Sequence, residues 1–348
     1  MRTIFPFLIG VICIGISTSP FCAAVDNQLD TYHKICSDTR AAVKERIEAC
    51  TAAITSKSDS ASNNAVSLTN RGDIYTSQGE YSLALADLDQ AILLDPTYAL
   101  AFNDRANVYM HEGKMELALR DVDQSIVLDP TLFQPYGNRC LIYLNQRNSD
   151  KALADCDNAI KLNPANGVVH MDRAIVYVLM GKYDLALQDL DEAYRLDPGI
   201  PGLLENRGMI LNHLEKYDLA TSDFCEVLKN HPTEAQALSG RCFSYLLLNR
   251  LVQALDDCNS ALKSNPKQLD ALTNRAMVYL KMNKGSLALA DFDEALKYQP
   301  GAVFLIYGRG VAKQMTGDNV GGHADMTRAL KIDSKIELTY RKYGLIKK

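Results

Sequence analysis

Cysteine is the residue type in this chain whose spacing points most directly to covalent chemistry. Cys140 precedes Cys156 by the same distance along the chain as Cys242 precedes Cys258. Two thiols at a recurring distance can form a disulfide if the fold brings them level with each other. The alternative is that they are small buried core residues, a frequent role of free cysteine. The choice depends on the elements that carry them and on the redox compartment.

Charged residues form a second regular set. Arginine recurs at one even spacing, at Arg71, Arg105, Arg139, Arg173, Arg207, Arg241, Arg275 and Arg309. Each arginine is followed at a fixed distance by an aspartate, at Asp87, Asp121, Asp155, Asp189, Asp223, Asp257, Asp291 and Asp325. Because every arginine has a matching carboxylate, we expect ion pairs that join helices rather than a basic stripe for an acidic partner. Partly buried pairs of this kind fix register more than they add stability.

Other residue types that support catalysis or metal binding are not arranged for it. The six histidines do not stand at metal-ligand spacing, and the sequence has no Cys-x-x-Cys, no phosphate-binding loop and no Gly-x-Ser-x-Gly or His-Glu-x-x-His motif. The sequence therefore predicts a protein that is not an enzyme, with no catalytic residues, cofactor, metal or small-molecule substrate. The net charge of −5 argues against a nucleic-acid partner, which would favour a basic face.

Prolines at a fixed spacing indicate which elements carry these residues. They stand at Pro96, Pro130, Pro164, Pro198, Pro232, Pro266 and Pro300. With proline at position 32, eight units begin at Ala65, Ala99, Phe133, Gly167, Pro201, Ala235, Leu269 and Val303. Apolar residues three to four apart predict two amphipathic helices in each unit. Glycines at position 15 predict the turn between the helices, and the residue before each proline avoids helical geometry and so ends the second helix.

This arrangement places the recurring cysteines opposite each other. Cys140 and Cys242 occupy position 8 of their units, and Cys156 and Cys258 occupy position 24. A hairpin that turns near position 16 brings positions 8 and 24 level. We therefore expect a disulfide within each of these two units, worth about 3 kcal/mol in the loop-entropy account.

The N-terminus has the layout of a secretory signal peptide. Arg2 precedes an apolar run from Ile4 to Ile16, and small residues follow up to Ala24. We predict a signal peptide over residues 1–24, cleavage near Ala24, and a secreted or periplasmic protein in which disulfides persist. The alternative is an uncleaved anchor, since about 20 residues span a bilayer. The protein would then contact a membrane through this segment alone.

Both ends of the repeat region have predicted caps. Residues 25–64 are expected to form an N-terminal cap, a degenerate half-repeat followed by a loop. Cys50 fits position 24 of that half-repeat, with Cys36 as its expected disulfide partner, which leaves Cys225 as a free thiol. Residues 335–348 are expected to form a C-terminal capping helix, which solenoids need to cover their last unit.

The pattern over residues 65–334 closely resembles the tetratricopeptide repeat (TPR) family, whose unit is a helical hairpin of about 34 residues. The resemblance lies in the small residues at positions 8 and 20, tyrosine at 11, mostly alanine at 27 and proline at 32. It implies an all-α fold, a right-handed α-solenoid of eight helical hairpins with terminal caps. With its signal peptide, the chain is similar to exported bacterial members of the family.

The resemblance also implies where a partner would bind. In the family, the first helix of each unit lines a concave groove at positions that include 6, 9 and 12. Asparagine at position 6 can exchange hydrogen bonds with an extended backbone, and apolar residues at 9 and 12 suggest hydrophobic anchors. The alternative is that these side chains only pack between units. The expected groove residues are Asn70, Asn138, Leu141, Leu144, Ile175, Val178, Asn206, Phe243, Leu246, Asn274, Met277 and Leu280.

The sequence thus predicts a non-enzymatic protein-binding scaffold of the periplasm or cell envelope, which holds a partner peptide or helix in its groove. Two alternatives remain open. One is a regulatory adaptor subunit of an envelope enzyme. The other is a self-assembling structural element whose repeats stack end to end.

Overall fold

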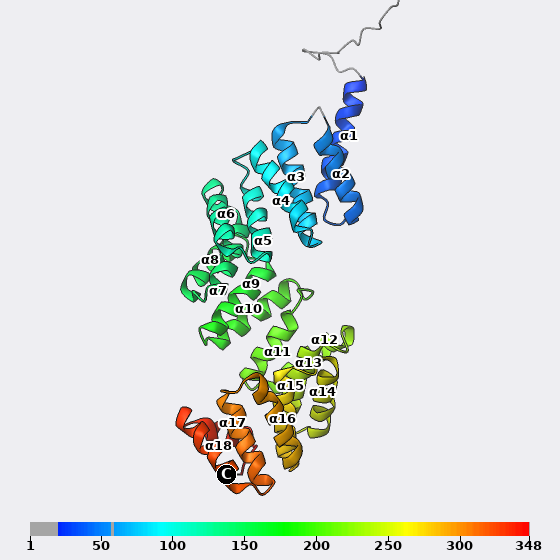
Figure 1. Ribbon diagram of the computed structural model, residues 1–348. Helices are drawn as coiled ribbons and strands as arrows, with labels where there is room; N and C mark the ends of the chain where they lie inside the picture. The colour runs from blue at the N-terminus through cyan, green and yellow to red at the C-terminus, as the bar shows by residue number, and fades with distance from the viewer. Residues whose placement is uncertain (1–19, 57–58, 348) are drawn as a thin grey trace, which may run out of the picture. The chain divides into compact units, whose positions relative to one another are not determined.

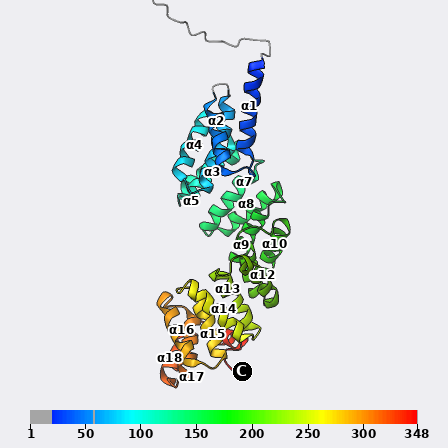
Figure 2. The same ribbon diagram turned by 90° about the vertical axis from the view of Figure 1, so that its right-hand side faces the viewer.

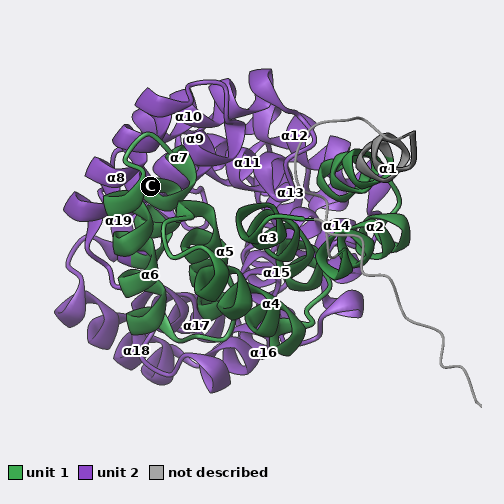
Figure 3. Cartoon of the chain, turned by 90° about the horizontal axis from the view of Figure 1, so that it is seen from above, with its two compact units in different colours: residues 1–142 green, residues 143–348 purple. Residues whose placement is uncertain are grey.

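The computed structural model describes residues 20–56 and 59–347. Over these residues the chain forms 19 helices and no strand, which confirms the predicted all-α class (Figure 1). The chain divides into two compact units, residues 1–142 (unit 1) and 143–348 (unit 2), which Figure 3 distinguishes by colour. The predicted signal peptide covers residues 1–24. Its first 19 residues lie outside the described part of the chain, and the remainder belongs to helix α1, which begins at Pro20.

Unit 1 contains α1 (Pro20–Ser37), α2 (Val43–Thr55), α3 (Ala61–Ser77), α4 (Tyr81–Leu94), α5 (Ala99–His111), α6 (Met115–Leu128) and most of α7 (Phe133–Asn145). Unit 2 contains the end of α7 and then α8 (Ser149–Leu162), α9 (Gly167–Leu179), α10 (Tyr183–Leu196), α11 (Leu203–His213), α12 (Tyr217–Asn230), α13 (Ala235–Leu247), α14 (Leu251–Ser264), α15 (Leu269–Lys281), α16 (Gly285–Tyr298), α17 (Val303–Met315), α18 (Asn319–Ile332) and α19 (Ile336–Lys342). None of these described helices is both long and apolar enough to cross a membrane.

Helices pack in sequence order within each unit. In unit 2, α13, α14, α15 and α16 follow one another (Figure 2). From α11 onward, the first helix of a repeat also contacts the first helix of the next repeat, as α11 contacts α13 and α13 contacts α15. Small residues make this approach possible. A Cβ on Gly208 would lie 2.7 Å from the Phe224 ring, and Ala186 and Ala220 are fully buried. The repeat positions that hold small residues therefore allow the helices to pack closely.

Every helical hairpin of the repeat turns through one left-handed residue at position 15. Four of these residues are glycines, Gly79, Gly113, Gly181 and Gly317, with φ between 71° and 94°. The other four are Arg147, Glu215, Asn249 and Asn283, with φ between 56° and 61°. The turn is thus set by the repeat and is adopted even where the side chain disfavours it.

The second helix of each unit stops just before the periodic proline, as predicted. The cap residues that precede the prolines have φ between −128° and −151° and ψ between 70° and 100°; they are Asp95, Asp129, Asn163, Asp197, His231, Asn265 and Gln299. These angles lie outside the helical region because the proline ring crowds the preceding residue.

The arginine and aspartate columns form the predicted ion pairs between the two helices of a unit. In the first unit, Arg71 Nε lies 2.7 Å from Asp87 Oδ2. The same pair occurs at Arg105–Asp121, Arg173–Asp189, Arg207–Asp223, Arg241–Asp257, Arg275–Asp291 and Arg309–Asp325. The aspartates of these pairs are buried, so each guanidinium compensates a carboxylate that water does not reach.

The same arginines also reach back to the preceding unit, a contact that the sequence reasoning missed. Arg105 Nη1 lies 2.8 Å from Asp89, and Arg173 Nη1 lies 2.7 Å from Asp157. The acceptor stands at position 25 of the preceding unit. In one unit the acceptor is a thiol, since Arg241 Nη1 donates to Cys225 Sγ at 3.3 Å.

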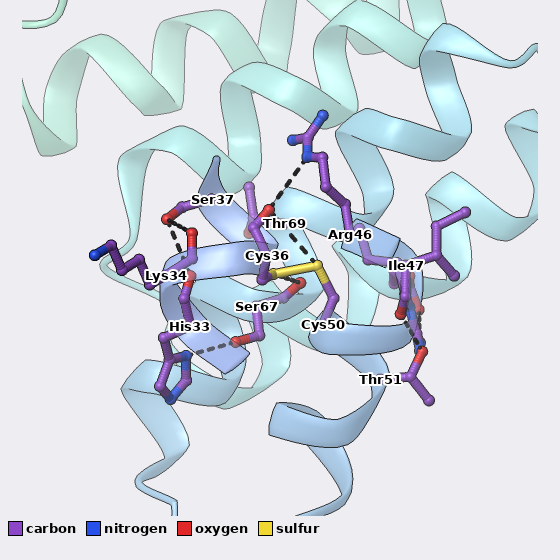
Figure 4. The surroundings of a disulfide bond; sticks show 12 residues. His33, Lys34, Cys36, Ser37, Arg46, Ile47, Cys50, Thr51, Ser67 and Thr69 are labelled. Atoms are coloured by element: carbon purple, nitrogen blue, oxygen red, sulfur yellow. Dashed lines mark hydrogen bonds and ion pairs between the residues drawn. A yellow bond between two sulfur atoms is a disulfide. The ribbon is translucent and has the colours of Figure 1, made fainter. Parts of the chain in front are cut away.

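Two predicted disulfides are present as pairs, Cys36–Cys50 and Cys242–Cys258. Cys140 and Cys156 are also disulfide-bonded, and Cys225 is the free cysteine of the described chain. The Cys36–Cys50 bond joins α1 to α2, and the Oγ of Ser67 on α3 lies 3.1 Å from the His33 ring (Figure 4). The predicted half-repeat is therefore a full pair of helices, because the residues before Cys36 are helical as well.

The C-terminal helix α19 packs against α17 and α18. Tyr340 is fully buried, and its hydroxyl donates to the Phe304 carbonyl at 2.7 Å. The chain then turns at Gly344, where φ is 66°, and Leu345 is buried in the core of unit 2.

Candidate functional site

The predicted groove residues of unit 1 are only partly accessible. Asn70 and Leu141 are half-buried. The side-chain amide of Asn138 donates to Asn103 Oδ1 at 2.9 Å, which joins two neighbouring first helices. This asparagine therefore serves the packing of α5 on α7, the alternative that the sequence left open.

Three predicted groove residues of unit 2 are core residues. Leu246, Met277 and Leu280 are 0%, 2% and 5% exposed. They belong to the hydrophobic core of unit 2, to which Leu345 of the C-terminal segment also contributes. Their prediction as surface anchors is corrected, because these three side chains are packed into the core of unit 2. Leu144 is half-buried and lines neither of the two pockets described next.

Three other predicted residues do come together. Ile175 and Val178 from α9 and Asn206 from α11 line an apolar pocket of about 140 Å³, which we call the apolar pocket. Ala174, Leu190, Met209 and Ile210 complete its wall. Ile175 and Met209 are 36% and 39% exposed, so an incoming side chain can reach both. These three predicted residues thus lie together at one surface pocket, and their role in binding stays a prediction.

A second, larger pocket adjoins the first and shares Met209 with it. This polar pocket has a volume of about 360 Å³ and includes the predicted residues Phe243 and Asn274. Its other lining residues are Asn212, His213, Glu215, Tyr217, Gln236, Ser239, Gly240, Asp270, Lys342 and Tyr343. They come from first helices α11, α13 and α15, from the turn and helix that follow α11, and from the C-terminal segment.

Hydrogen bonds hold the amides of the polar pocket in place. Asn212 donates from Nδ2 to the Gly240 carbonyl at 3.0 Å and accepts from the Ser244 hydroxyl at 2.8 Å. Asn274 donates from Nδ2 to the Ser239 carbonyl at 3.1 Å. These asparagines bridge neighbouring first helices. Their amides therefore shape the pocket floor and are not held ready to hydrogen-bond with a ligand backbone.

Burial shifts the pKa of one side chain in the wall. It raises the pKa of the Tyr217 phenol from 10 to about 12, with the charge of Glu215 and the nearby Tyr343 adding to the effect. Near neutral pH a phenol is protonated even at its ordinary pKa, so Tyr217 offers a neutral ring and a hydroxyl.

The C-terminal segment forms one side of the polar pocket. Lys342 Nζ lies 2.6 Å from Glu215 Oε1, and the Tyr343 ring meets the Phe243 ring edge-on at 5.7 Å between centroids. The sequence predicted a cap here but not this contact with a residue far back in the chain. No local signal reveals it, because it depends on how α19 docks.

The described residues contain no group of three or more histidine, cysteine or acidic side chains placed to hold a metal ion. The two pockets instead combine an apolar cleft with an open polar basin, an arrangement suited to non-covalent binding.

Comparisons with known proteins agree with the architecture. Residues 72–113 match a family model described as TPR repeat, and residues 141–201 match one described as Tetratricopeptide repeat. A search of curated protein sequences found no match.

Solved structures show the same fold. The crystal structure of the APC/C hetero-tetramer Cut9–Hcn1 aligns with 82% of this chain at 17% identity and a TM-score of 0.62, and this chain spans about half (54%) of that one. A tetratricopeptide repeat protein from Parabacteroides merdae aligns with 71% of this chain and 98% of its own, at 16% identity and a TM-score of 0.51. PilW, described as a type IV pilus biogenesis factor, aligns with 58% of this chain and 93% of its own, at 16% identity and a TM-score of 0.52. The two matched segments are therefore tetratricopeptide repeats, and the solved structures show the same helical fold over a larger part of the chain.

Proposed function

We propose that this protein is a non-enzymatic scaffold that binds a segment of a partner protein on the first-helix face of unit 2, the face formed by α9, α11, α13 and α15. TPR arrays are scaffolds for protein interaction. The observation that carries the proposal is the pair of adjoining pockets that share Met209. An apolar side chain of the partner enters the apolar pocket, and the flanking segment crosses the polar pocket.

The partner segment is a peptide or a helix, and apolar anchoring supplies most of its affinity. Ile175 and Met209 are each more than a third exposed next to an apolar cleft. Burial of such surface is worth about 25 cal/mol per Å². The acidic balance of the chain leaves nucleic acid an unfavourable ligand.

Affinity capture with the mature full-length chain tests this function. Ile175→Glu and Met209→Glu each place a charge at the mouth of the apolar pocket and should abolish capture of the partner. Leu219→Glu is the matched control, since Leu219 is 58% exposed on α12 and lines neither pocket. If both pocket variants still capture the partner, the first-helix face is not the binding site.

We further propose that the protein acts after export, in the periplasm or outside the cell. The disulfides support this, because such bonds persist in oxidising compartments. Sequencing of the N-terminus of the protein isolated from an exporting host should find a start near Val25. A start at Met1 in a membrane fraction would instead support the anchored form.

A further inference from the structure

We propose that the polar pocket of unit 2 recognises a basic side chain, arginine or lysine, of the partner segment. This inference rests on the proposed function and specifies its partner: a peptide that carries a cation beside the apolar anchor. Three observations support it, namely two carboxylates, a group of aromatic rings, and a lysine of the chain itself seated at one of the carboxylates.

The carboxylates come from two different repeats. Glu215 stands in the turn between α11 and α12, and Asp270 stands in the first turn of α15. Both side chains are exposed. Asp270 has no ion-pair partner within the described part of the chain, whereas Glu215 pairs with Lys342. The pocket therefore carries two acids and one internal cation, which leaves it net negative.

Aromatic rings line the same pocket as these acids. Phe243, Tyr217 and Tyr343 all line the pocket, and the Tyr343 ring meets the edge of Phe243. The faces of such rings attract an ammonium or guanidinium group, because the ring quadrupole is negative there. The Tyr217 phenol is uncharged near neutral pH, as phenols ordinarily are.

Lys342 shows that the pocket accepts a cation. Its ammonium lies 2.6 Å from Glu215, although the two residues are far apart in sequence. The side chains of Lys342 and Glu215 are 56% and 55% exposed, so their ion pair is weak and exchangeable. A guest cation can therefore occupy the space beside Asp270 or replace Lys342 at Glu215.

Other cations do not occupy the pocket within the described part of the chain. The nearby Lys281 does not line it, since its ammonium donates to the Leu246 carbonyl at 3.0 Å and burial lowers its pKa. His213 lines the pocket, and its ring packs at a tilt against Tyr183, with 3.6 Å between the centroids.

The test uses the mature full-length chain and an array of heptapeptides. Each peptide has a leucine at a varied position and arginine, lysine, glutamine or glutamate at the centre. We expect arginine and lysine peptides to be retained about five- to tenfold more strongly than their glutamine counterparts. In the double variant Glu215→Gln/Asp270→Asn this ratio should fall to about one. Lys342→Met, which removes the internal competitor, should raise retention of the basic peptides about two- to threefold.

The matched control is Asp218→Asn. Asp218 is an exposed acid near Glu215 that pairs with Arg250 and lies outside the pocket, so its loss should leave the ratio unchanged. Melting curves of all variants check folding, and the single variants Glu215→Gln and Asp270→Asn serve if the double variant does not fold. Equal retention of basic and glutamine peptides, or a preference that persists without both acids, would overturn the proposal.

Two further outcomes separate this inference from the proposed function. If Ile175→Glu abolishes all retention while the acid variants change nothing, the groove function stands and the basic partner is wrong. If the wild-type chain retains no peptide, both are wrong. Light scattering on the same samples tests whether a second copy of this chain occupies the polar pocket instead. Self-association that depends on Glu215 and Asp270 would overturn the partner assignment.

Discussion

The arginine at position 7 contacts two repeats at once. Arg275 binds the buried Asp291 of its own unit through Nε and Nη2 and reaches Asn259 of the preceding unit through Nη1. Its guanidinium also lies 5.9 Å from the centroid of the Tyr279 ring. One planar group thus joins three other side chains, a task that lysine, with a single charged point, cannot perform.

Removal of this arginine should be costly. We expect Arg275→Met to lower the free energy of unfolding by about 2–4 kcal/mol, because Asp291, 6% exposed, would be left as an uncompensated buried charge. Urea unfolding followed by circular dichroism measures the loss.

Arg195→Met is the matched control. Arg195 is 67% exposed and pairs with Glu192 within its own helix, so its loss should lower the stability far less than the loss of Arg275. Equal losses in the two variants would contradict the structural role of the Arg275 network.

A buried acid at position 6 should make stability depend on pH. Asp172 is 6% exposed, and burial raises its pKa from 3.8 to about 7. The folded chain therefore holds this proton up to about pH 7, whereas the unfolded chain releases it near pH 4. Folding is then favoured most at the acidic end, and the stability contribution is lost as pH rises from about 4 to 7.

Asparagine already occupies this column at Asn138 and Asn206, so Asp172→Asn should fold normally. We expect it to raise the free energy of unfolding by about 2–4 kcal/mol at pH 8 and to change it little at pH 4. Thermal melts of both proteins across this range check the prediction. A gain of the same size at both pH values would show that ionisation is not the cause.

At the scale of elements, the turn at position 15 shows the repeat overriding local preference. The sequence predicts the four glycine turns, but it does not show that arginine, glutamate and asparagine adopt the same left-handed geometry. They do so because the two helices of each hairpin must still bring their small residues into register to pack closely. The cost is backbone strain of about 1 kcal/mol for a residue with a Cβ.

Glycine at these sites should relieve that strain. Arg147→Gly and Asn283→Gly, with φ of 56° in both cases, should each stabilise the protein by about 0.5–1 kcal/mol. The reverse change Gly181→Ala should destabilise it by about 1 kcal/mol, although nothing lies within 4 Å of the added Cβ. Chemical denaturation measures all three, and a neutral Gly181→Ala would show that the strain is negligible.

The disulfide between α13 and α14 supports the hairpin that carries Phe243. The double variant Cys242→Ala/Cys258→Ala should lose about 3 kcal/mol of stability, since it removes a cross-link between residues far apart in the unfolded chain. Dithiothreitol should lower the melting temperature of the wild type in the same direction. Cys225→Ala, which removes the free thiol, should have a much smaller effect, and a comparable loss would count against the disulfide account.

At the scale of the whole molecule, most of the correct structural predictions follow from the regular spacing of the prolines. Pro96 to Pro300 set the frame, and from it the helical pairs, the Arg–Asp pairs and the cysteine pairing of position 8 with 24 follow from helix geometry alone. Ile175 and Val178, which the frame assigns to positions 9 and 12, both line the apolar pocket.

Features that break the period could not be read from it. Met277 stands at the same repeat position as the exposed Ile175 and Met209 but is buried, because it belongs to the core of unit 2, to which the C-terminal residue Leu345 also contributes. Glu215 and Lys342 meet through the docking of α19, and no position of the repeat indicates this contact. A repeat pattern reports the neighbours of each unit, not the contacts of the segments that flank the array.

The docking of α19 also bears on how the protein should be handled. Tyr343 and Leu345 precede the final lysines by only a few residues, and both take part in the packing of unit 2. A purification handle or fluorescent fusion attached behind those lysines would crowd the pocket wall and distort any affinity measured with it. A label attached near Val25 in α1, the predicted start of the mature chain, would not be joined to the segment that forms that wall.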